Sequence, residues 1–495
     1  MSTAAEQKKR VAIIGGGCSG LACAWHLLQD SNNCDIHLYE QSSKLGGHAN
    51  TVHIDKSDID VDIGFMVFND DNYPNMTSWF DALGVPSEAS DMSLSVSLDR
   101  GKTVEWCSTS VAGMCANPSQ LLRPGFYKFI AEMLRFNRDA AKILMLPKDD
   151  PNRVVTTAQY LRHNGYSEEF CSYYLIPMMA ALWSASIEDV LQFPAEQLIG
   201  FLCNHKMLQV SREIQVDYYT ALIACYFQLI MIVNSQIFDR PDWKTVAGRS
   251  KTYTLKMAEM LGERAHLSCP IVSVKQNYIN GAVNSMKYEL FTAGEESVGI
   301  FDEVVFACAP PIAAKMLALG SDEASTTKQL TEILNEVQYE DNAIYVHSDP
   351  ELMPQSKAAW ASWNCLGKSE LLTTHTTAST NNTGAFEGGE SGFGNRAIDH
   401  NGASVSKLEG ENGRMRAVFV TYWLNKLQNL ETENDIFVSL NPHSAPKESC
   451  VHHKVIMAHP QFTPQTLHAR EMLEENFQGK DGLWFCGAWG GYGFQ

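Results

Sequence analysis

A short glycine-rich segment carries the clearest chemical signal in this sequence. Gly15, Gly17 and Gly20 have the spacing G-x-G-x-x-G, and they follow the β-branched apolar run at residues 11–14. In this spacing the first glycine makes a tight turn, the second lets a pyrophosphate approach the backbone, and the third lets the next helix pack closely. The unpaired N–H groups at the start of that helix would bind the phosphates. The segment therefore predicts a dinucleotide-binding turn.

An acidic residue follows at the distance that such a turn requires. The next apolar run, residues 35–39, ends at Glu40, about twenty residues after the last glycine of the turn. A carboxylate at this point of a βαβ unit can bind the ribose hydroxyls of the adenosine. Gln41, next to this acid, and Cys18 and Ser19, inside the turn, are further candidates for contact with the dinucleotide.

A second glycine pair indicates which dinucleotide is bound. Gly46 and Gly47 are followed by His48, at a place where simple nicotinamide dehydrogenases need no glycine pair. In flavoproteins of the amine oxidase and carotenoid desaturase type, Gly-Gly-Arg-x-x-(Ser/Thr) lies here along the pyrophosphate and ribityl chain of FAD. Residues 44–51 resemble that element, with histidine in place of arginine. Because histidine is only partly charged near pH 7, His48 would be a weaker phosphate partner. An ordinary loop turn is the alternative.

Longer segments narrow the resemblance to one branch of this FAD-dependent superfamily. The branch contains NAD/FAD-binding proteins of unassigned substrate and the N-terminal oxidoreductase module of plant cyclopropane-fatty-acid synthases. The resemblance implies an α/β fold with a Rossmann-like FAD-binding domain of the glutathione-reductase type and an inserted α+β substrate domain. It also implies FAD as the cofactor and redox chemistry. The segments that resemble the branch are residues 60–69, 73–75, 163–167, 175–178, 240–248 and 420–425.

The resemblance also implies contacts with FAD further along the chain. Gly64 and Phe65 would pass close to the flavin ring, because glycine permits a close backbone approach. Ile271 and Val272 begin a strand that would offer backbone groups to the adenine, although plain sheet core is the alternative for their side chains. Gly487 would meet the ribityl chain.

The order of strand and helix signals predicts two domains, of which the first is discontinuous. The FAD-binding domain is assigned to residues 1–97, 241–312 and 476–495. The substrate domain is assigned to a helical part at residues 98–240 and a mixed α/β part at residues 313–475.

Two stretches depart from the pattern of the family. Residues 210–238 are an atypical insert containing an apolar run at residues 220–233. As a helix this run would span about 21 Å, short of the roughly 30 Å of a bilayer core, so no transmembrane span is expected. An untranslated stretch of the gene, a buried helix and contact with a membrane interface are the three explanations. Residues 367–413 are rich in Gly, Ser, Thr and Asn and are expected to be a disordered surface insert.

The C-terminal end also differs from the family. Many relatives place an acid after the last glycine to hold the ribityl hydroxyls, and here Ala488 follows Gly487. The family then continues into a helix whose N-terminus points at the flavin. This sequence ends at Gln495, where that helix would begin. A non-catalytic or flavin-free partner subunit is therefore one alternative to an enzyme.

The resemblance implies hydride transfer from a substrate to flavin N5, and it leaves the substrate open. The fused methyltransferases of the relatives suggest an apolar, lipid-like substrate and a cyclopropane-synthase-like methyltransferase as partner. Oxidation of small amines is the alternative. His347, at the end of a strand, is a weak candidate for a catalytic acid or base, and a structural histidine is the alternative.

Composition limits the kinds of partner, metal site and compartment that the chain can have. The 495 residues have a net charge of −19 and no evident basic stripe, which argues against nucleic acid and against electrostatic adsorption to anionic lipid. The thirteen cysteines are scattered without metal-ligand spacing, so reduced thiols and no metal are expected. Residues 1–10 are polar and lack the features of a signal peptide, which favours a cytoplasmic protein.

Overall fold

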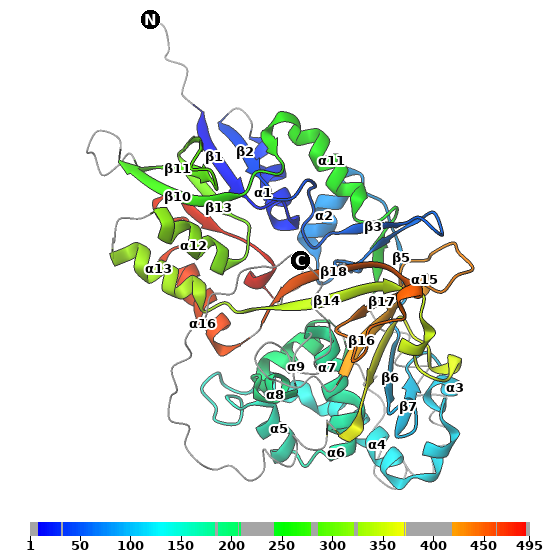
Figure 1. Ribbon diagram of the computed structural model, residues 1–495. Coiled ribbons are helices and arrows are strands. Elements are labelled where there is room, and N and C mark those ends of the chain that lie inside the picture. The colour runs from blue at the N-terminus through cyan, green and yellow to red at the C-terminus, as the bar shows by residue number, and fades with distance from the viewer. Residues whose placement is uncertain are drawn as a thin grey trace, which may run out of the picture.

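The structure is a computed structural model with two main β-sheets (Figure 1). The atypical insert at residues 210–238 lies outside the described residues, as does most of the insert expected at residues 367–413. Gly367 itself is the last residue of a strand. The described residues are 8–30, 33–183, 187–205, 207–208, 242–278, 286–320, 325–370, 372, 418–461 and 463–491.

The first sheet has five parallel strands in the order β19-β13-β1-β2-β9. Its central strand β1 is buried on both faces. Val11 and Ile13 belong to one apolar cluster, and Ala12 and Ile14 belong to another on the opposite face. A parallel strand covered on both sides needs such a continuous apolar run. The strands are β1 (Lys9–Ile14), β2 (Cys34–Tyr39), β9 (Ala265–His266), β13 (Glu303–Phe306) and β19 (Leu483–Phe485).

Helices and short strands cover the two faces of the parallel sheet. One face packs against α1 (Cys18–Gln29), α2 (Pro74–Leu83) and α11 (Lys251–Leu261), whose apolar residues share a cluster. The other face packs against a three-stranded antiparallel sheet and the helices at the left of Figure 1. These elements are β10 (Ile271–Tyr278), β11 (Met286–Thr292), β12 (Ser297–Phe301), α12 (Pro310–Gly320), α13 (Ser325–Asn335) and α16 (Pro464–Asn476).

Two small antiparallel pairs complete this half of the molecule. The hairpin of β3 (Thr51–Ile54) and β4 (Ile59–Asp62) follows the second glycine pair directly. The pair of β5 (Ser87–Ala89) and β8 (Lys244–Val246) joins two segments that are distant in sequence.

The second sheet has seven strands in the order β18-β14-β17-β16-β15-β6-β7. Neighbouring strands are antiparallel except β15 and β6, which are parallel. The boundary predicted at residue 97 falls inside β6. This strand pairs with β15, so it belongs to the second sheet and not to the parallel sheet. The strands are β6 (Leu94–Leu98), β7 (Val104–Cys107), β14 (Tyr339–His347), β15 (Trp363–Gly367), β16 (Val418–Trp423), β17 (Phe437–Leu440) and β18 (Val451–Pro460).

Helices pack against this second sheet around a large aromatic and aliphatic core, seen at the bottom of Figure 1. The helix α4 contributes Phe129 and Phe136 to this core. The helices and short turns are α3 (Val111–Met114), η1 (Pro118–Leu122), α4 (Pro124–Asp139), η2 (Ala140–Met145), α5 (Thr157–His163), α6 (Glu168–Phe170), α7 (Ile176–Trp183), α8 (Ile187–Gln192), α9 (Ala195–Asn204) and α15 (Leu424–Leu427).

Candidate functional site

The first glycine turn lies between β1 and α1. Gly15 has a φ of 113°, which favours glycine, and a side chain there would place its Cβ 2.4 Å from the carbonyl oxygen of Ala307. A Cβ on Gly20 would lie 2.0 Å from the carbonyl oxygen of Gly15. Both positions therefore require glycine because protein backbone occupies the space.

The second glycine pair packs directly against the first turn. The N–H of Gly46 donates to the carbonyl of Gly16 at 2.8 Å. Gly47 has a φ of 58°, and its Cβ would lie 3.1 Å from the Cα of Gly17. A Cβ on Gly17, by contrast, would meet no described atom within 4 Å. No described residue therefore occupies the space in front of Gly17, beside both glycine segments.

Glu40 lies beside this turn at the end of β2. Its Oε2 accepts a hydrogen bond from the N–H of Gly16 at 2.7 Å, and its Oε1 accepts one from the N–H of Ser42 at 2.8 Å. The side chain is almost entirely buried. The acid is thereby fixed at the carboxyl edge of the sheet, where ligands of open α/β folds bind.

The other predicted contacts of the first turn differ in exposure. Cys18 is buried, and burial raises the pKa of its thiol to about 12, so the thiol is uncharged near pH 7. Ser19 is half-buried and Gln41 is exposed. Cys18 could therefore contact a phosphate only through its backbone.

The start of β10 lies next to Glu40. The N–H of Cys269 donates to the carbonyl of Glu40 at 2.9 Å, two residues before the strand begins. Ile271 pairs with β11, and the register then shifts before Ser273, so Val272 is the extra residue of a bulge. The backbone of Val272 is outside the strand ladder, as a backbone that binds an adenine would have to be. The side chain of Ile271 is buried in the core.

His48 connects the second glycine pair to the seven-stranded sheet. Its Nε2–H donates to the carbonyl of Ala458 in β18 at 3.0 Å, and its ring lies 5.2 Å from that of His459. Burial lowers the pKa of His48, so the ring is neutral near pH 7. The carbonyl of His48 accepts from the N–H of Phe65 at 2.9 Å, and a Cβ on Gly64 would lie 2.0 Å from the same oxygen.

Asp62 is a buried acid behind this segment that sequence reasoning did not single out. Its Oδ1 accepts from the Thr51 hydroxyl at 2.6 Å, and its Oδ2 accepts from the N–H and hydroxyl of Ser250 at 2.8 and 2.9 Å. The side chain of Gln428 contacts both backbone groups of Asp62, at 3.0 and 2.8 Å. Burial raises the pKa of Asp62 to about 6. Asp62 thus connects the β3–β4 hairpin to the start of α11 and to the end of α15, two residues before Gly64.

Gly487 follows β19, close to an indole donor. A Cβ on Gly487 would lie 2.5 Å from Nε1 of Trp489. This Nε1 is buried and has no hydrogen-bond partner among the described residues. An acceptor from a bound molecule would satisfy it. The tail after Gly491 lies outside the described residues.

His347 lies in a different part of the molecule. The imidazole is fully buried, its Nδ1 accepts from the N–H of Asp349 at 3.1 Å, and its Nε2–H donates to the Ser439 hydroxyl at 2.8 Å. Burial lowers its pKa to about 4. Asp341 in β14 pairs with Ala458 in β18, whose carbonyl His48 contacts. His347 lies six residues further along β14. That separation is about 20 Å, so His347 is not brought to the glycine turns.

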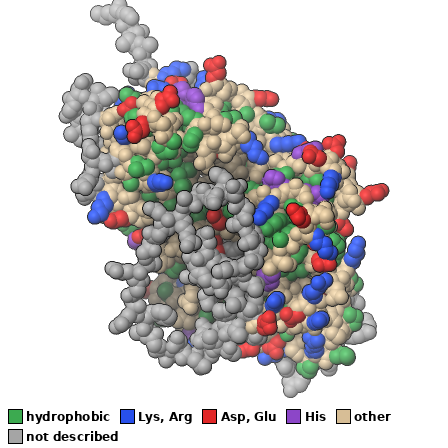
Figure 2. All heavy atoms as spheres, viewed as in Figure 1, with side chains coloured by type: hydrophobic (Ala, Val, Ile, Leu, Met, Phe, Trp, Pro, Cys, Tyr) green, Lys and Arg blue, Asp and Glu red, His purple; other side chains and the backbone are tan. Residues whose placement is uncertain are grey.

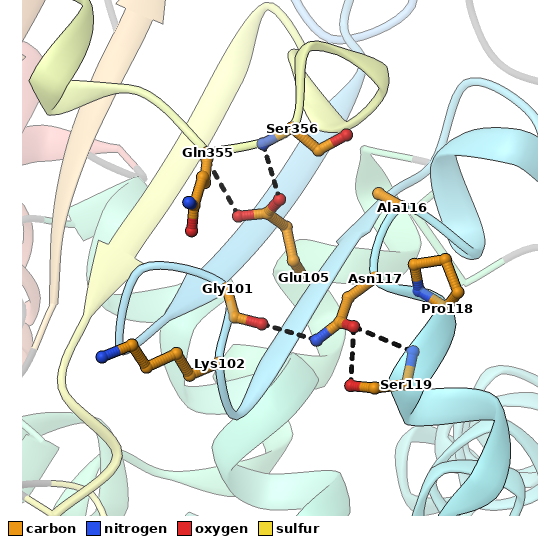
Figure 3. A pocket seen from close by; sticks show the side chains of 9 residues that line it. All are labelled: Gly101, Lys102, Glu105, Ala116, Asn117, Pro118, Ser119, Gln355 and Ser356. Carbon is orange, nitrogen blue, oxygen red and sulfur yellow. Dashed lines mark hydrogen bonds between the residues drawn. The ribbon is translucent and has the colours of Figure 1, made fainter.

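A separate surface groove of about 460 Å³ lies near the β6–β7 turn (Figure 3). Figure 3 shows the carboxylate of Glu105 accepting from the N–H groups of Gln355 and Ser356, at 3.0 and 2.8 Å. The polar groups of the groove therefore bind one another. Its lining residues are Gly101, Lys102, Glu105, Ala116, Asn117, Pro118, Ser119, Gln355 and Ser356.

Three further observations concern the described part of the chain. Its twelve cysteines are free thiols. Within it, no three His, Cys, Asp or Glu side chains are arranged to hold a metal ion. No helix in it combines the length and the apolar character needed to cross a bilayer.

The comparisons with known proteins agree with this geometry. Residues 13–83 match the family model of the NAD(P)-binding Rossmann-like domain. Reduced UDP-galactopyranose mutase superposes with a TM-score of 0.58 at 12% identity, over 99% of this chain and 90% of that one. Cyclohexylamine oxidase from Brevibacterium oxydans IH-35A gives 0.55 at 12% identity, over 99% and 95%. The chain has the fold of these enzymes.

A third structure with this fold is the CLA-producing fatty acid isomerase from P. acnes. It gives a TM-score of 0.54 at 11% identity, over 97% of this chain and 93% of that one. A comparison with curated proteins finds no match to the sequence. The shared fold confirms the predicted α/β class with a Rossmann-like domain.

Proposed function

We propose that the chain binds FAD along its two glycine segments and is an oxidoreductase of the amine-oxidase type. One observation carries this proposal: where both glycine segments and Glu40 meet, none of the described residues fills the space in front of Gly17. The first turn of α1 begins at this point and would bind the pyrophosphate. Two glycine segments side by side favour FAD, because a simple nicotinamide site needs only the first.

The residues around this point fit FAD at three places along its length. Glu40 is fixed where the adenosine ribose would lie. The bulge at Val272 leaves backbone groups for the adenine. The Nε1 of Trp489, which has no partner among the described residues, offers a donor beside Gly487, where the ribityl chain would pass. Ala488 contributes no acid there, so the indole is the polar group that this chain provides instead.

Bound FAD would supply the hydride acceptor, and the residues of the chain would position it. Gly64 would keep its segment packed against that of His48, because a larger residue cannot fit against the carbonyl of His48. Asp62 would hold that segment through Thr51 and Ser250. The neutral ring of His48 would connect the cofactor site to β18 rather than neutralise a phosphate.

The visible absorption spectrum of the purified chain tests the cofactor. We expect flavin bands that leave with an FAD-sized molecule on heating, and a loss of bound flavin in Glu40→Ala. Unfolding curves measured on the same variant would separate a lost contact from a lost fold. A colourless, folded wild-type chain would contradict FAD binding and favour a flavin-free partner subunit.

For the substrate we propose an apolar, lipid-like molecule, and small amines are the alternative. The resemblance to the synthase-fused module supports the lipid class, whereas the fold occurs in an amine oxidase and in a fatty acid isomerase alike. Anaerobic mixing with fatty-acyl lipids should bleach the flavin bands. Bleaching by small amines alone would contradict the lipid class.

The same resemblance suggests a methyltransferase of the cyclopropane-synthase type as partner. A pull-down with the purified methyltransferase should then retain this chain at stoichiometric amounts. Absence of retention would leave the oxidoreductase acting without that partner.

A further inference from the structure

One outer face of the molecule carries a positive charge that the total charge conceals. Residues 100–148 contain eight Lys and Arg but three Asp and Glu, in a chain with a total charge of −19. With Asp99, Asp149 and Asp150, which border this segment, its net charge is +2. Salt screens exposed charges beyond about 8 Å, so acids on other faces contribute little here. Figure 2 shows several Lys and Arg side chains at the lower right, with a group of Asp and Glu side chains beside them, where Figure 1 places α4, β6 and β7.

The helix α4 and the turn η2 carry the centre of this charge. Lys128, Arg135, Arg138 and Lys142 follow one another at intervals of seven, three and four residues, which puts them along one side of a helix. The opposite side of α4 is buried in the core, so this side faces outward. The charged groups therefore form a stripe along the surface.

The three acids of the segment leave the stripe positive, although Glu169 of the neighbouring α6 lies against the first turn of α4. Glu105 is buried and accepts from backbone N–H groups, and Glu132 accepts from the N–H and hydroxyl of Ser167. Asp139 alone lies within the stripe, between Arg138 and Lys142. That group of three retains a positive charge.

Exposed apolar side chains stand at both ends of the stripe. Leu122 at the end of η1 is 86% exposed, and Met145 at the end of η2 is 82% exposed. A single exposed leucine is ordinary on a protein surface. Here, however, two such side chains flank a positively charged helix surface about 24 Å long, so basic and apolar groups would meet an anionic membrane together.

We propose that this basic face, formed by Leu122, the outer side of α4 and Met145, docks on the surface of membranes that contain anionic phospholipids. The helix would lie parallel to the membrane plane, with its Lys and Arg at the headgroup phosphates. Leu122 and Met145 would enter the region between headgroups and acyl chains. The local charge complements anionic lipid, which reverses the expectation drawn from the charge of the whole chain.

Co-sedimentation of the full chain with lipid vesicles tests the proposal. Binding is expected to vesicles of phosphatidylcholine with phosphatidylserine, to fall with added salt, and to be absent with phosphatidylcholine alone. Each basic side chain near an anionic surface strengthens binding about fivefold, so Lys128→Glu/Lys142→Glu should weaken it at least about 25-fold. Leu122→Gln should weaken it about tenfold with the salt dependence unchanged. At 86% exposure this substitution leaves the fold intact.

The control variants make equal changes on another face. Lys315→Glu/Lys328→Glu alters the same charge on α12 and α13, and Leu319→Gln alters a leucine that is 59% exposed. Vesicle binding by these variants should equal that of the wild-type chain. An equal loss of vesicle binding in the variants of the basic face and in the control variants would show that total charge is the cause. That result would overturn the proposal.

Three other results would also overturn the proposal. The first is no binding to anionic vesicles, and the second is equal binding to neutral vesicles. The third is that Leu122→Gln binds vesicles as well as the wild-type chain does while heparin competes for binding. This third result would indicate a general surface for polyanions or nucleic acid. Vesicle binding needs no flavin, so its failure and a failure to bind FAD are separate outcomes.

Discussion

Buried polar groups have different surroundings in the two sheets. In the seven-stranded sheet they form a continuous row across five strands, from His347 through Ser439, Thr421 and Asn364 to Ser95. All five side chains are fully buried and each has a partner. Such a completed network stabilises and orients strands. It leaves no group for a ligand.

Elsewhere in the described part of the chain, some buried polar groups lack such partners. The Nε1 of Trp489 and the Oγ of Ser273 are buried without a hydrogen-bond partner among the described residues. Val272, at the bulge within β10, lies outside the strand ladder. Because an unsatisfied buried group costs about 1–3 kcal/mol, the Nε1 of Trp489 beside Gly487 indicates a place that a bound molecule would complete. The comparison separates polar groups that hold the fold from those that await a ligand.

The largest expected effect distinguishes two glycines of one turn. Gly20→Ala places its Cβ 2.0 Å from the carbonyl oxygen of Gly15, so the free energy of unfolding should fall by more than about 3 kcal/mol. Gly17→Ala meets no described atom within 4 Å and should leave the free energy of unfolding within about 1 kcal/mol of the wild-type value. It should nevertheless weaken FAD binding, since the new methyl group occupies the approach of the pyrophosphate. Denaturant titration and flavin content measure the two effects, and full flavin content in Gly17→Ala would contradict the site.

A change in the polar row should affect stability alone. Asn364→Ala removes hydrogen bonds to Ser95, Thr421 and the backbone of Ala361, and should lower the free energy of unfolding by about 3 kcal/mol. The affinity for FAD should stay unchanged. Loss of flavin from a variant that is still folded would refute the separation of the two groups.

The buried Asp62 predicts a dependence of stability on pH. Burial raises its pKa to about 6 from the usual 3.8, so between about pH 4 and 6 the folded chain keeps a proton that the unfolded chain has lost. The stabilisation is full below pH 4 and is lost as the pH rises through 6, a change of about 2 to 3 kcal/mol. Denaturant titrations across this range should show a steeper decline for the wild-type chain than for Asp62→Asn. Parallel curves would contradict the raised pKa.

The smallest effect concerns His48. Because its ring is neutral and donates to the carbonyl of Ala458, His48→Ala should cost about 1 kcal/mol of stability and change FAD affinity less than about threefold. Fluorescence titration with FAD measures the second quantity. A tenfold loss of affinity would make His48 a phosphate partner after all.

The sequence predicts the local parts of this fold well and the long-range parts poorly. The β1–α1–β2 unit follows from adjacent residues, and its glycines have the contacts that their spacing implies. The membership of β6 in the second sheet was missed, because its partner β15 lies far away in sequence. Trp489 and Asp62 were likewise missed as polar groups of the candidate site, since burial of a polar atom depends on what packs around it.

The basic face was missed for a different reason. A total charge is an average over the surface, and the fold sorts charges onto separate faces. The interval pattern of Lys128, Arg135 and Lys142 was visible in the sequence, but only the burial of the opposite side of α4 shows which way it points.

The parallel pairing of β6 with β15 also bears on how the chain is made. About 260 residues separate Leu98, the last residue of β6, from Trp363, the first residue of β15. A ribosome adds about 5–20 residues per second, so this strand edge emerges tens of seconds before its neighbour. Throughout that interval its backbone N–H and C=O groups can pair with any other extended segment. Synthesis of this protein should therefore depend on chaperones that shield nascent strands, and fast expression should favour inclusion bodies over soluble product.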